Sequence, residues 1–284
     1  MRSIFAFLLL FMVNVAQAAE ISDVSYGPDP LQNLDVYSPE NCPQVGCPVL
    51  VWVHGGGWRM GDKSNDSTHG IVKAWVPRGA IVVAVNYRLS PAVVHPVHVQ
   101  DVAASIAWVK QNIQGYGGNP NKVFLMGHSA GAHLVALVAT DPQYLKPYGL
   151  HPADALAGVF PIDSASYDLT ESVKEAWVGR MVRQAFGDNR DALNLASPIW
   201  LASHNRRERY PVFILAATKQ RDSAVFQMNE LVQQLQRDGA NAQGIIVDYP
   251  AMRQLEAHRE IAMDLGDPTS TMTKRLMVEV GLHP

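Results

Sequence analysis

The chain has 284 residues, of which 48% are hydrophobic and 17% are charged, and its formal net charge is −3. This composition supports a folded core and excludes a disordered chain or a small domain held together mainly by disulfides. A charge this close to neutral provides no basic surface for nucleic acid. We therefore expect a globular protein without a nucleic-acid partner.

The first eighteen residues have the pattern of a signal peptide. Arg2 precedes an apolar run over residues 4–13, and Ala16 and Ala18 place small side chains at the positions that a signal peptidase requires. The run is shorter than the roughly 20 residues of a membrane-spanning helix. We expect cleavage near Ala18, export to the periplasm or the medium, and no stable membrane insertion of the chain that remains.

The two cysteines, Cys42 and Cys47, lie close together in a stretch rich in turn-forming residues. Export would place them in an oxidising compartment, where a local disulfide forms readily. The alternative is a pair of free thiols in a surface loop. No basic or metal-binding side chain accompanies either cysteine, so neither is expected to be catalytic.

Short apolar runs rich in β-branched residues alternate with segments of helical period along the rest of the chain. The runs cover residues 34–37, 49–53, 80–85, 123–126, 157–160, 212–215 and 245–247. Continuous apolar runs are typical of strands buried on both faces of a parallel sheet. The alternation predicts a single α/β domain over residues 19–284. The segment 164–210 is less regular, and any small cap or lid is expected there.

A G-x-S-x-G motif, Gly127-His128-Ser129-Ala130-Gly131, directly follows the fourth apolar run and precedes a helical segment. Strand, sharp turn and helix form the context in which this motif presents a nucleophilic serine. The glycines allow a turn in which a Cβ would collide with neighbouring backbone. The sequence therefore predicts Ser129 as a nucleophile at the start of a helix.

A second glycine-rich motif, His54-Gly55-Gly56-Gly57-Trp58, follows the second apolar run. Consecutive glycines at a strand end let backbone N–H groups converge on one point, as an oxyanion requires. A flexible surface loop is the alternative. A phosphate-binding loop is disfavoured because Asp62 stands before Lys63, and its carboxylate would repel phosphate.

These two motifs, in this order, resemble those of the α/β-hydrolase superfamily, and in particular the esterase and lipase group with HGGGW and GHSAG motifs. Within that group the chain is most similar to the carboxylesterase-like and kynurenine formamidase-like branch. The resemblance implies an α/β-hydrolase fold with a mostly parallel sheet of about eight strands and helices on both faces. It also implies that Gly56, Gly57 and Ala130 donate N–H groups to the oxyanion, with no cofactor and no metal.

The resemblance further implies a triad in the chain order serine, acid, histidine. Asp222 follows the sixth apolar run and is the predicted acid, although its loop lacks the glycine that the family usually has. Asp163 and Asp168 are reserve candidates, and a helix N-cap is the alternative role of Asp222. Only His258 and His283 lie beyond Asp222, and His283 is next to the chain end, so His258 is the predicted base.

The expected activity is hydrolysis of carboxylic esters with small or medium acyl groups, by attack of Ser129 and formation of an acyl-enzyme. Its partner would be a small ester. Trp58, Met60 and His128 are candidate pocket residues, although Trp58 and Met60 would equally suit the core. Two alternatives remain open: an arylformamidase acting on N-formylkynurenine-type amides, and a hydrolase fold that only binds a ligand.

Overall fold

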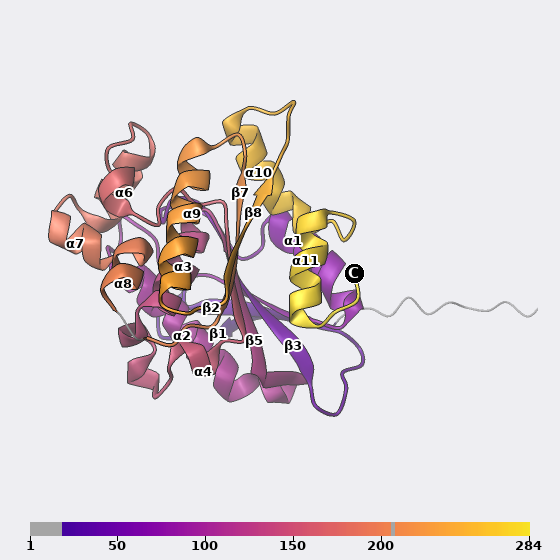
Figure 1. The fold of residues 1–284 in the computed structure, drawn as a ribbon. Coiled ribbons are helices and arrows are strands. Elements are labelled where there is room, and N and C mark those ends of the chain that lie inside the picture. The colour runs from indigo at the N-terminus through magenta and orange to yellow at the C-terminus, as the bar shows by residue number, and fades with distance from the viewer. Residues whose placement is uncertain (1–18, 206–207) are drawn as a thin grey trace, which may run out of the picture.

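A single eight-stranded sheet forms the centre of the molecule in the computed structural model, which describes residues 19–205 and 208–284. The predicted signal peptide lies outside the described residues. The strand order is β1-β2-β4-β3-β5-β6-β7-β8, with β2 antiparallel to β1 and β4 and all other neighbours parallel (Figure 1). The strands are β1 (Ala19–Ser25), β2 (Asn33–Ser38), β3 (Cys47–Val53), β4 (Ile81–Val85), β5 (Gly118–His128), β6 (Gly158–Ile162), β7 (Val212–Thr218) and β8 (Ala242–Val247).

Helices cover both faces of this sheet, as Figure 1 shows. Helices α2, α3 and α9 pack on one face, and α1, α10 and α11 pack on the other. The helices are α1 (Asp66–Trp75), α2 (Val97–Asn112), α3 (Ala130–Thr140), α4 (Pro152–Ala155), α5 (Leu169–Ser172), α6 (Val178–Phe186), α7 (Arg190–Leu195), α8 (Pro198–His204), α9 (Asp222–Arg237), α10 (Gln254–Asp264) and α11 (Thr271–Val280).

Strand β3 shows how the sequence builds these two layers. Successive side chains of a strand point to opposite faces of the sheet. Val49, Val51 and Val53 accordingly join the core under α2, α3 and α9, whereas Leu50 and Trp52 join the core under α1, α10 and α11. All five are buried because both faces are covered, which explains why the run is continuously apolar.

Each of the seven apolar runs overlaps a strand to within one residue, which confirms the predicted sheet of about eight strands with helices on both faces. The strand that the sequence analysis missed is β1, at the edge of the sheet. Its side chains are mostly exposed and include Glu20, Ser22 and Asp23. An edge strand that buries little apolar surface leaves no hydrophobic run in the sequence, so the pattern could not reveal it.

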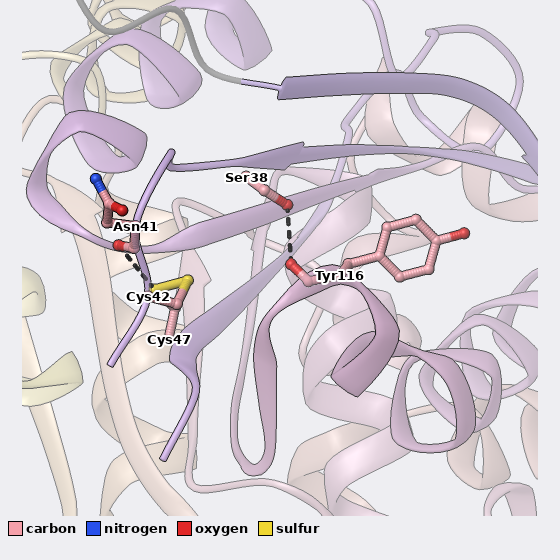
Figure 2. Close-up of a disulfide and its surroundings, with 5 residues drawn as sticks. All are labelled: Ser38, Asn41, Cys42, Cys47 and Tyr116. Carbon is pink, nitrogen blue, oxygen red and sulfur yellow. Dashed lines mark hydrogen bonds between the residues drawn. A yellow bond between two sulfur atoms is a disulfide. The ribbon is translucent and has the colours of Figure 1, made fainter. Parts of the chain in front are cut away.

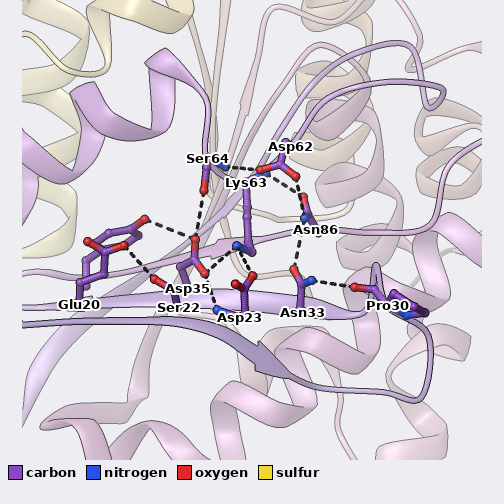
Figure 3. Close-up of polar contacts among 11 residues, drawn as sticks. Glu20, Ser22, Asp23, Pro30, Asn33, Asp35, Asp62, Lys63, Ser64 and Asn86 are labelled. Carbon is purple, nitrogen blue, oxygen red and sulfur yellow. Dashed lines mark hydrogen bonds and ion pairs between the residues drawn. The ribbon is translucent and has the colours of Figure 1, made fainter.

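A polar cluster around the buried Lys63 ties the segment after the second glycine-rich motif to the sheet, as Figure 3 shows. The Lys63 ammonium lies 2.7 Å from the Asp35 carboxylate of β2 and 2.9 Å from Asp23 of β1. The Lys63 backbone N–H donates to the Asn86 side chain, which in turn donates to Asp62. Because Asp35 and Lys63 are both buried, each charge depends on the other.

We predict that Lys63→Met lowers the free energy of unfolding by about 3 kcal/mol, because it leaves the buried Asp35 carboxylate without its cation. The backbone N–H of Asp23 would still donate to Asp35, which keeps the effect at the lower end of the range for broken buried pairs. Urea unfolding measures the change. Lys73→Met removes an exposed lysine of α1 and serves as the control; an equal loss in both variants would contradict the prediction.

A disulfide joins Cys42 to Cys47 at the start of β3, with a Cα–Cα distance of 5.1 Å (Figure 2). Cys47 is fully buried, and its backbone N–H donates to the Gly117 carbonyl of the loop that precedes β5. Nearby, the Ser38 hydroxyl donates to the Tyr116 carbonyl. The bridge therefore holds the loop between β2 and β3 at the end of the sheet opposite the carboxyl ends of the parallel strands.

The Cys42→Ser/Cys47→Ser double variant is predicted to lose at most about 2 kcal/mol of stability, since the bridge closes a short loop and restricts the unfolded chain only modestly. The loop lies far along the strands from Ser129, so kcat/KM should stay close to that of the unchanged protein. Thermal unfolding and ester hydrolysis measure the two quantities. A loss of activity in a folded double variant would show that this loop influences the site.

In the described residues of the irregular segment 164–210, four short helices, α5 to α8, lie between β6 and β7. Figure 1 places α6, α7 and α8 together at one side of the sheet. Trp177, Val178 and Met181 of this segment line cavities above Ser129. Of the helices that the structure describes, none combines the length and the apolar character that a bilayer crossing needs.

Candidate active site

Ser129 occupies a strained turn between β5 and α3, with φ 57° and ψ −118°. The turn is possible because Gly127 and Gly131 lack side chains. A Cβ on Gly127 would lie 2.5 Å from the Gly131 carbonyl oxygen, and one on Gly131 would lie 2.2 Å from the carbonyl oxygen of Val53 in β3. Strain held by close backbone packing is typical of functional positions, and here it presents the serine at the carboxyl end of the sheet.

A continuous hydrogen-bonded chain runs from Ser129 through His258 to Asp163. The Ser129 Oγ atom lies 3.0 Å from His258 Nε2, and His258 Nδ1 lies 2.6 Å from Asp163 Oδ2. His258 comes from α10, whereas Ser129 and Asp163 directly follow the neighbouring strands β5 and β6. The structure thus brings together the predicted serine and histidine with one of the two reserve acids.

Asp163, the aspartate hydrogen-bonded to His258, is ionised. Asp163 is fully buried, and burial alone would raise its pKa. The hydrogen bond from His258 and the positive charge of Arg221 outweigh burial and lower the pKa of Asp163 to about 2. The Thr218 N–H donates to the other carboxylate oxygen at 3.0 Å. Asp163 is therefore ionised and fixed in direction at neutral pH.

The prediction that Asp222 is the acid is wrong in this geometry. Asp222 is exposed in the first turn of α9, where a carboxylate interacts favourably with the helix dipole. Chain order could not separate the candidates, because Asp163 and Asp222 both lie between Ser129 and His258. The position of the strands identifies the acid. Strand β6 ends beside β5, so Asp163, which follows β6, lies next to Ser129 and reaches His258. Asp168, the other reserve candidate, caps α5 instead.

Burial lowers the pKa of His258; the Asp163 hydrogen bond opposes this effect, and the Arg221 charge adds to it. The result is a neutral imidazole that is available as a base at neutral pH. His128 supports it from behind: its Nε2 lies 2.8 Å from the His258 carbonyl oxygen, and the two rings are 4.4 Å apart. Burial lowers the pKa of His128 to about 3, so its ring is neutral and donates to that carbonyl.

Arg221 also contacts Asp163 and His258, and no motif in the sequence pointed to it. Its Nη1 atom lies 2.8 Å from Asp163 Oδ2, 2.9 Å from the Asp163 carbonyl oxygen and 2.7 Å from His258 Nδ1. The side chain is only 15% exposed. The available signal was weak: Arg221 stands in the loop after β7, where the family usually has a glycine and where the acid was expected.

The second glycine-rich motif lies beside the serine. A Cβ on Gly55 would come within 3.1 Å of the Ser129 Cβ, and Gly57 has φ 61°, which favours glycine. Ala130 is the first residue of α3, so its N–H needs no partner within the helix. Gly56, Gly57 and Ala130 all line the cavities that open at Ser129, and their role as oxyanion donors stays a prediction.

Two cavities meet at Ser129 and His258, one of about 420 Å³ and one of about 690 Å³. Trp58 lines the smaller cavity and also packs against His133 and Phe186, so it combines the two roles that the sequence left open. Met60 is exposed and lines the larger cavity, and His128 lines that cavity as well.

Within the described part of the chain, one group of three side chains has ligand atoms close enough to hold a metal ion: His128, Asp163 and His258. Both ring nitrogens of His258 already have hydrogen-bond partners in Asp163 and Ser129. A metal here would have to break the contacts that orient the histidine. The donor set therefore fits proton transfer better than metal binding.

A strained serine after β5, hydrogen-bonded to a histidine and a buried aspartate at the carboxyl edge of this sheet, defines the class as an α/β-hydrolase. The family model described as BD-FAE matches residues 34–235. The chain belongs to that family.

Curated relatives are esterases. Esterase LipQ of Mycobacterium tuberculosis is 37% identical over 213 residues, which cover 71% of this chain and 49% of LipQ. Isoprenylcysteine alpha-carbonyl methylesterase ICME of Arabidopsis thaliana is 40% identical over 113 residues, which cover 40% of this chain and 26% of ICME. The matched part of the chain thus spans about half of LipQ and about a quarter of ICME.

Solved structures share the fold. A truncated carbohydrate esterase from gut microbiota has a TM-score of 0.73 at 18% identity, covering 94% of this chain and 96% of that chain. Esterase B from Lactobacillus rhamnosis has a TM-score of 0.71 at 20% identity, covering 93% of this chain and 84% of that chain. These likenesses confirm the predicted α/β-hydrolase fold.

Proposed function

We propose that the protein is a serine esterase that hydrolyses carboxylic esters through an acyl-enzyme. The observation that carries the proposal is the hydrogen-bonded chain from Ser129 through His258 to Asp163, at the point where two cavities meet. The esterase names among the curated relatives support the same reaction.

In this mechanism, His258 Nε2 accepts the hydroxyl proton of Ser129 as Oγ attacks the ester carbonyl carbon. Asp163 stabilises the imidazolium that forms, because its carboxylate remains ionised beside Nδ1. The N–H groups of Gly56, Gly57 and Ala130, which line the cavities at Ser129, would donate to the oxyanion. His258 then returns the proton to the leaving alcohol, and water attacks the acyl-enzyme by the same route.

The two cavities favour esters whose acyl group is small or medium. The smaller cavity is bounded by Trp58, Val178 and Met181, and the larger one opens past Met60 toward solvent. We infer that one cavity receives the acyl group and the other the alcohol.

A series of 4-nitrophenyl esters from acetate to palmitate tests this preference. We expect kcat/KM to be highest for short acyl chains and to fall as the chain outgrows its cavity. Faster cleavage of long-chain triglycerides than of short esters would contradict it. N-formylkynurenine, measured alongside, tests the formamide alternative; a higher kcat/KM for this amide than for every ester would replace esterase by formamidase.

We also propose that the protein is exported. The basic start at Arg2, the apolar run over residues 4–13 and the small residues before residue 19 support this location, and the Cys42–Cys47 disulfide is consistent with an oxidising compartment. N-terminal sequencing of protein from the periplasmic and culture fractions tests it. An uncleaved chain that remains in the cytoplasmic fraction would contradict it.

A further inference from the structure

The loop after β7 supplies a cation to the site where the sequence predicted an acid. Arg221 directly precedes α9, and its guanidinium contacts both His258 and Asp163 from the side opposite Ser129's hydrogen bond. Its side chain is largely buried and lines the smaller cavity together with Ser129. A buried cation in contact with two members of a proton-transfer chain must influence where the proton resides.

Two contacts compete for His258 Nδ1. The ionised Asp163 carboxylate at 2.6 Å only accepts and calls for a proton on Nδ1, whereas Arg221 Nη1 at 2.7 Å only donates and calls for a bare nitrogen. We assign the proton to Nδ1, because the carboxylate contact is the shorter one and Arg221 has two other acceptors in Oδ2 and the carbonyl oxygen of Asp163. Nδ1 therefore donates to Asp163, and Arg221 donates to the same oxygen. Nε2 then carries no proton and accepts the hydrogen bond of the Ser129 hydroxyl. This is the tautomer in which His258 can act as a base toward Ser129.

This arrangement places two positive groups side by side whenever His258 is protonated. Arg221 Nη1 lies 2.7 Å from Nδ1, so the positive guanidinium stands directly beside the protonated ring. The imidazolium is thus opposed by Arg221 and favoured by Asp163. Arg221 also secures the carboxylate by bonding both Oδ2 and the backbone carbonyl of Asp163.

We propose that Arg221 is a positioning residue of the esterase, one that fixes Asp163 against His258 and sets the acidic limit of the pH range in which His258 acts as a base. This inference rests on the proposed function. The charged and titratable groups that act on His258 are Asp163 after β6, Arg221 after β7, His128 at the end of β5 and Arg259 on α10 itself. Glu175 and Arg180, from the segment between β6 and β7, line the cavities that meet at His258. Of the cations named here, Arg221 is the one within hydrogen-bond distance of Asp163 and His258.

The direction of the effect follows from the contacts. Burial lowers the pKa of His258, and Arg221 lowers it further, so the bare base persists to lower pH. Activity measured as kcat/KM rises with pH as His258 loses its proton. Removal of the guanidinium should therefore move the acidic limb of the profile to higher pH, by about one unit for a charge in direct contact.

The test compares kcat/KM of a short 4-nitrophenyl ester between pH 4 and pH 9 in four proteins: the unchanged chain, Arg221→Met, Arg221→Lys and Arg237→Met. Arg221→Met removes the positive charge. Arg221→Lys retains the charge but lacks the planar guanidinium and its several N–H donors. Arg237→Met makes the same substitution at the exposed far end of α9. We expect the acidic limb of the kcat/KM profile to move to higher pH in Arg221→Met and to stay in place in Arg237→Met. Arg221→Lys should keep the limb near its original pH while lowering kcat.

Arg221→Gln, which can still donate to Asp163, replaces the methionine variant if the latter does not fold. Arg259→Gln tests whether any nearby cation suffices; because Arg259 is exposed, its smaller shift should vanish at high salt, whereas that of Arg221 should persist. A folded neutral variant that loses activity equally at every pH would overturn the proposal. Failure of Ser129 to react with a fluorophosphonate in the unchanged chain would instead overturn the proposed function, so the two failures are distinguishable.

Discussion

Asp163→Asn is expected to lower kcat for ester hydrolysis about 10⁴-fold, the effect of losing the carboxylate that orients a catalytic histidine. The amide would present a donor or a neutral oxygen to His258 Nδ1, which removes the stabilisation of the imidazolium and allows the wrong tautomer. It would also leave Arg221 without its anionic partner in a buried position. Steady-state hydrolysis of a short ester, with the folded fraction checked by circular dichroism, measures the loss.

Asp222→Asn is the matched control, because the same substitution is made on the aspartate that chain order alone would select. Asp222 is exposed in the first turn of α9, and its replacement should change kcat by less than about twofold and stability by a few tenths of a kcal/mol. A large loss of activity in Asp222→Asn, with Asp163→Asn still active, would refute the assignment that the geometry supports.

Ser129→Ala is expected to lower kcat by roughly 10⁵- to 10⁶-fold, because the residual rate would come only from the oxyanion donors and from substrate binding. The variant should still fold, since alanine fits where the serine Oγ faces the cavity. Reaction with a fluorophosphonate probe gives a second measurement that does not depend on the choice of ester.

The unchanged protein should be labelled once by that probe, and Ser129→Ala should not be labelled. Ser203→Ala is the control, because Ser203 lies on α8 and lines neither cavity, and its hydroxyl contacts Trp200 and His204 of the same helix. Labelling of Ser129→Ala would point to another nucleophile. An unlabelled and inactive wild-type chain would leave the fold as a ligand-binding module.

The elements that the sequence predicted well are those whose signal is local. The run over residues 123–126 and the glycines around Ser129 specify a strand followed by a sharp turn, and both are present. His258 could be chosen because only His258 and His283 lie beyond the sixth apolar run and the acid candidate Asp222, and His283 is next to the chain end. The segment 164–210 has no such periodicity, and its four short helices could not be placed. Strand β1 was missed for the related reason that it buries almost nothing.

By itself, then, the sequence determined the layered fold, the serine and the histidine, because strand burial, tight turns and chain order are all written in neighbouring residues. Only the tertiary structure decided the acid and the cation. Asp163 and Asp222 satisfy the same chain order. The choice depends on which aspartate the fold places beside His258, and it is Asp163 whose Oδ2 lies 2.6 Å from His258 Nδ1. Arg221 meets that pair only because β6 and β7 are adjacent in the sheet, a relation that the sequence pattern does not contain.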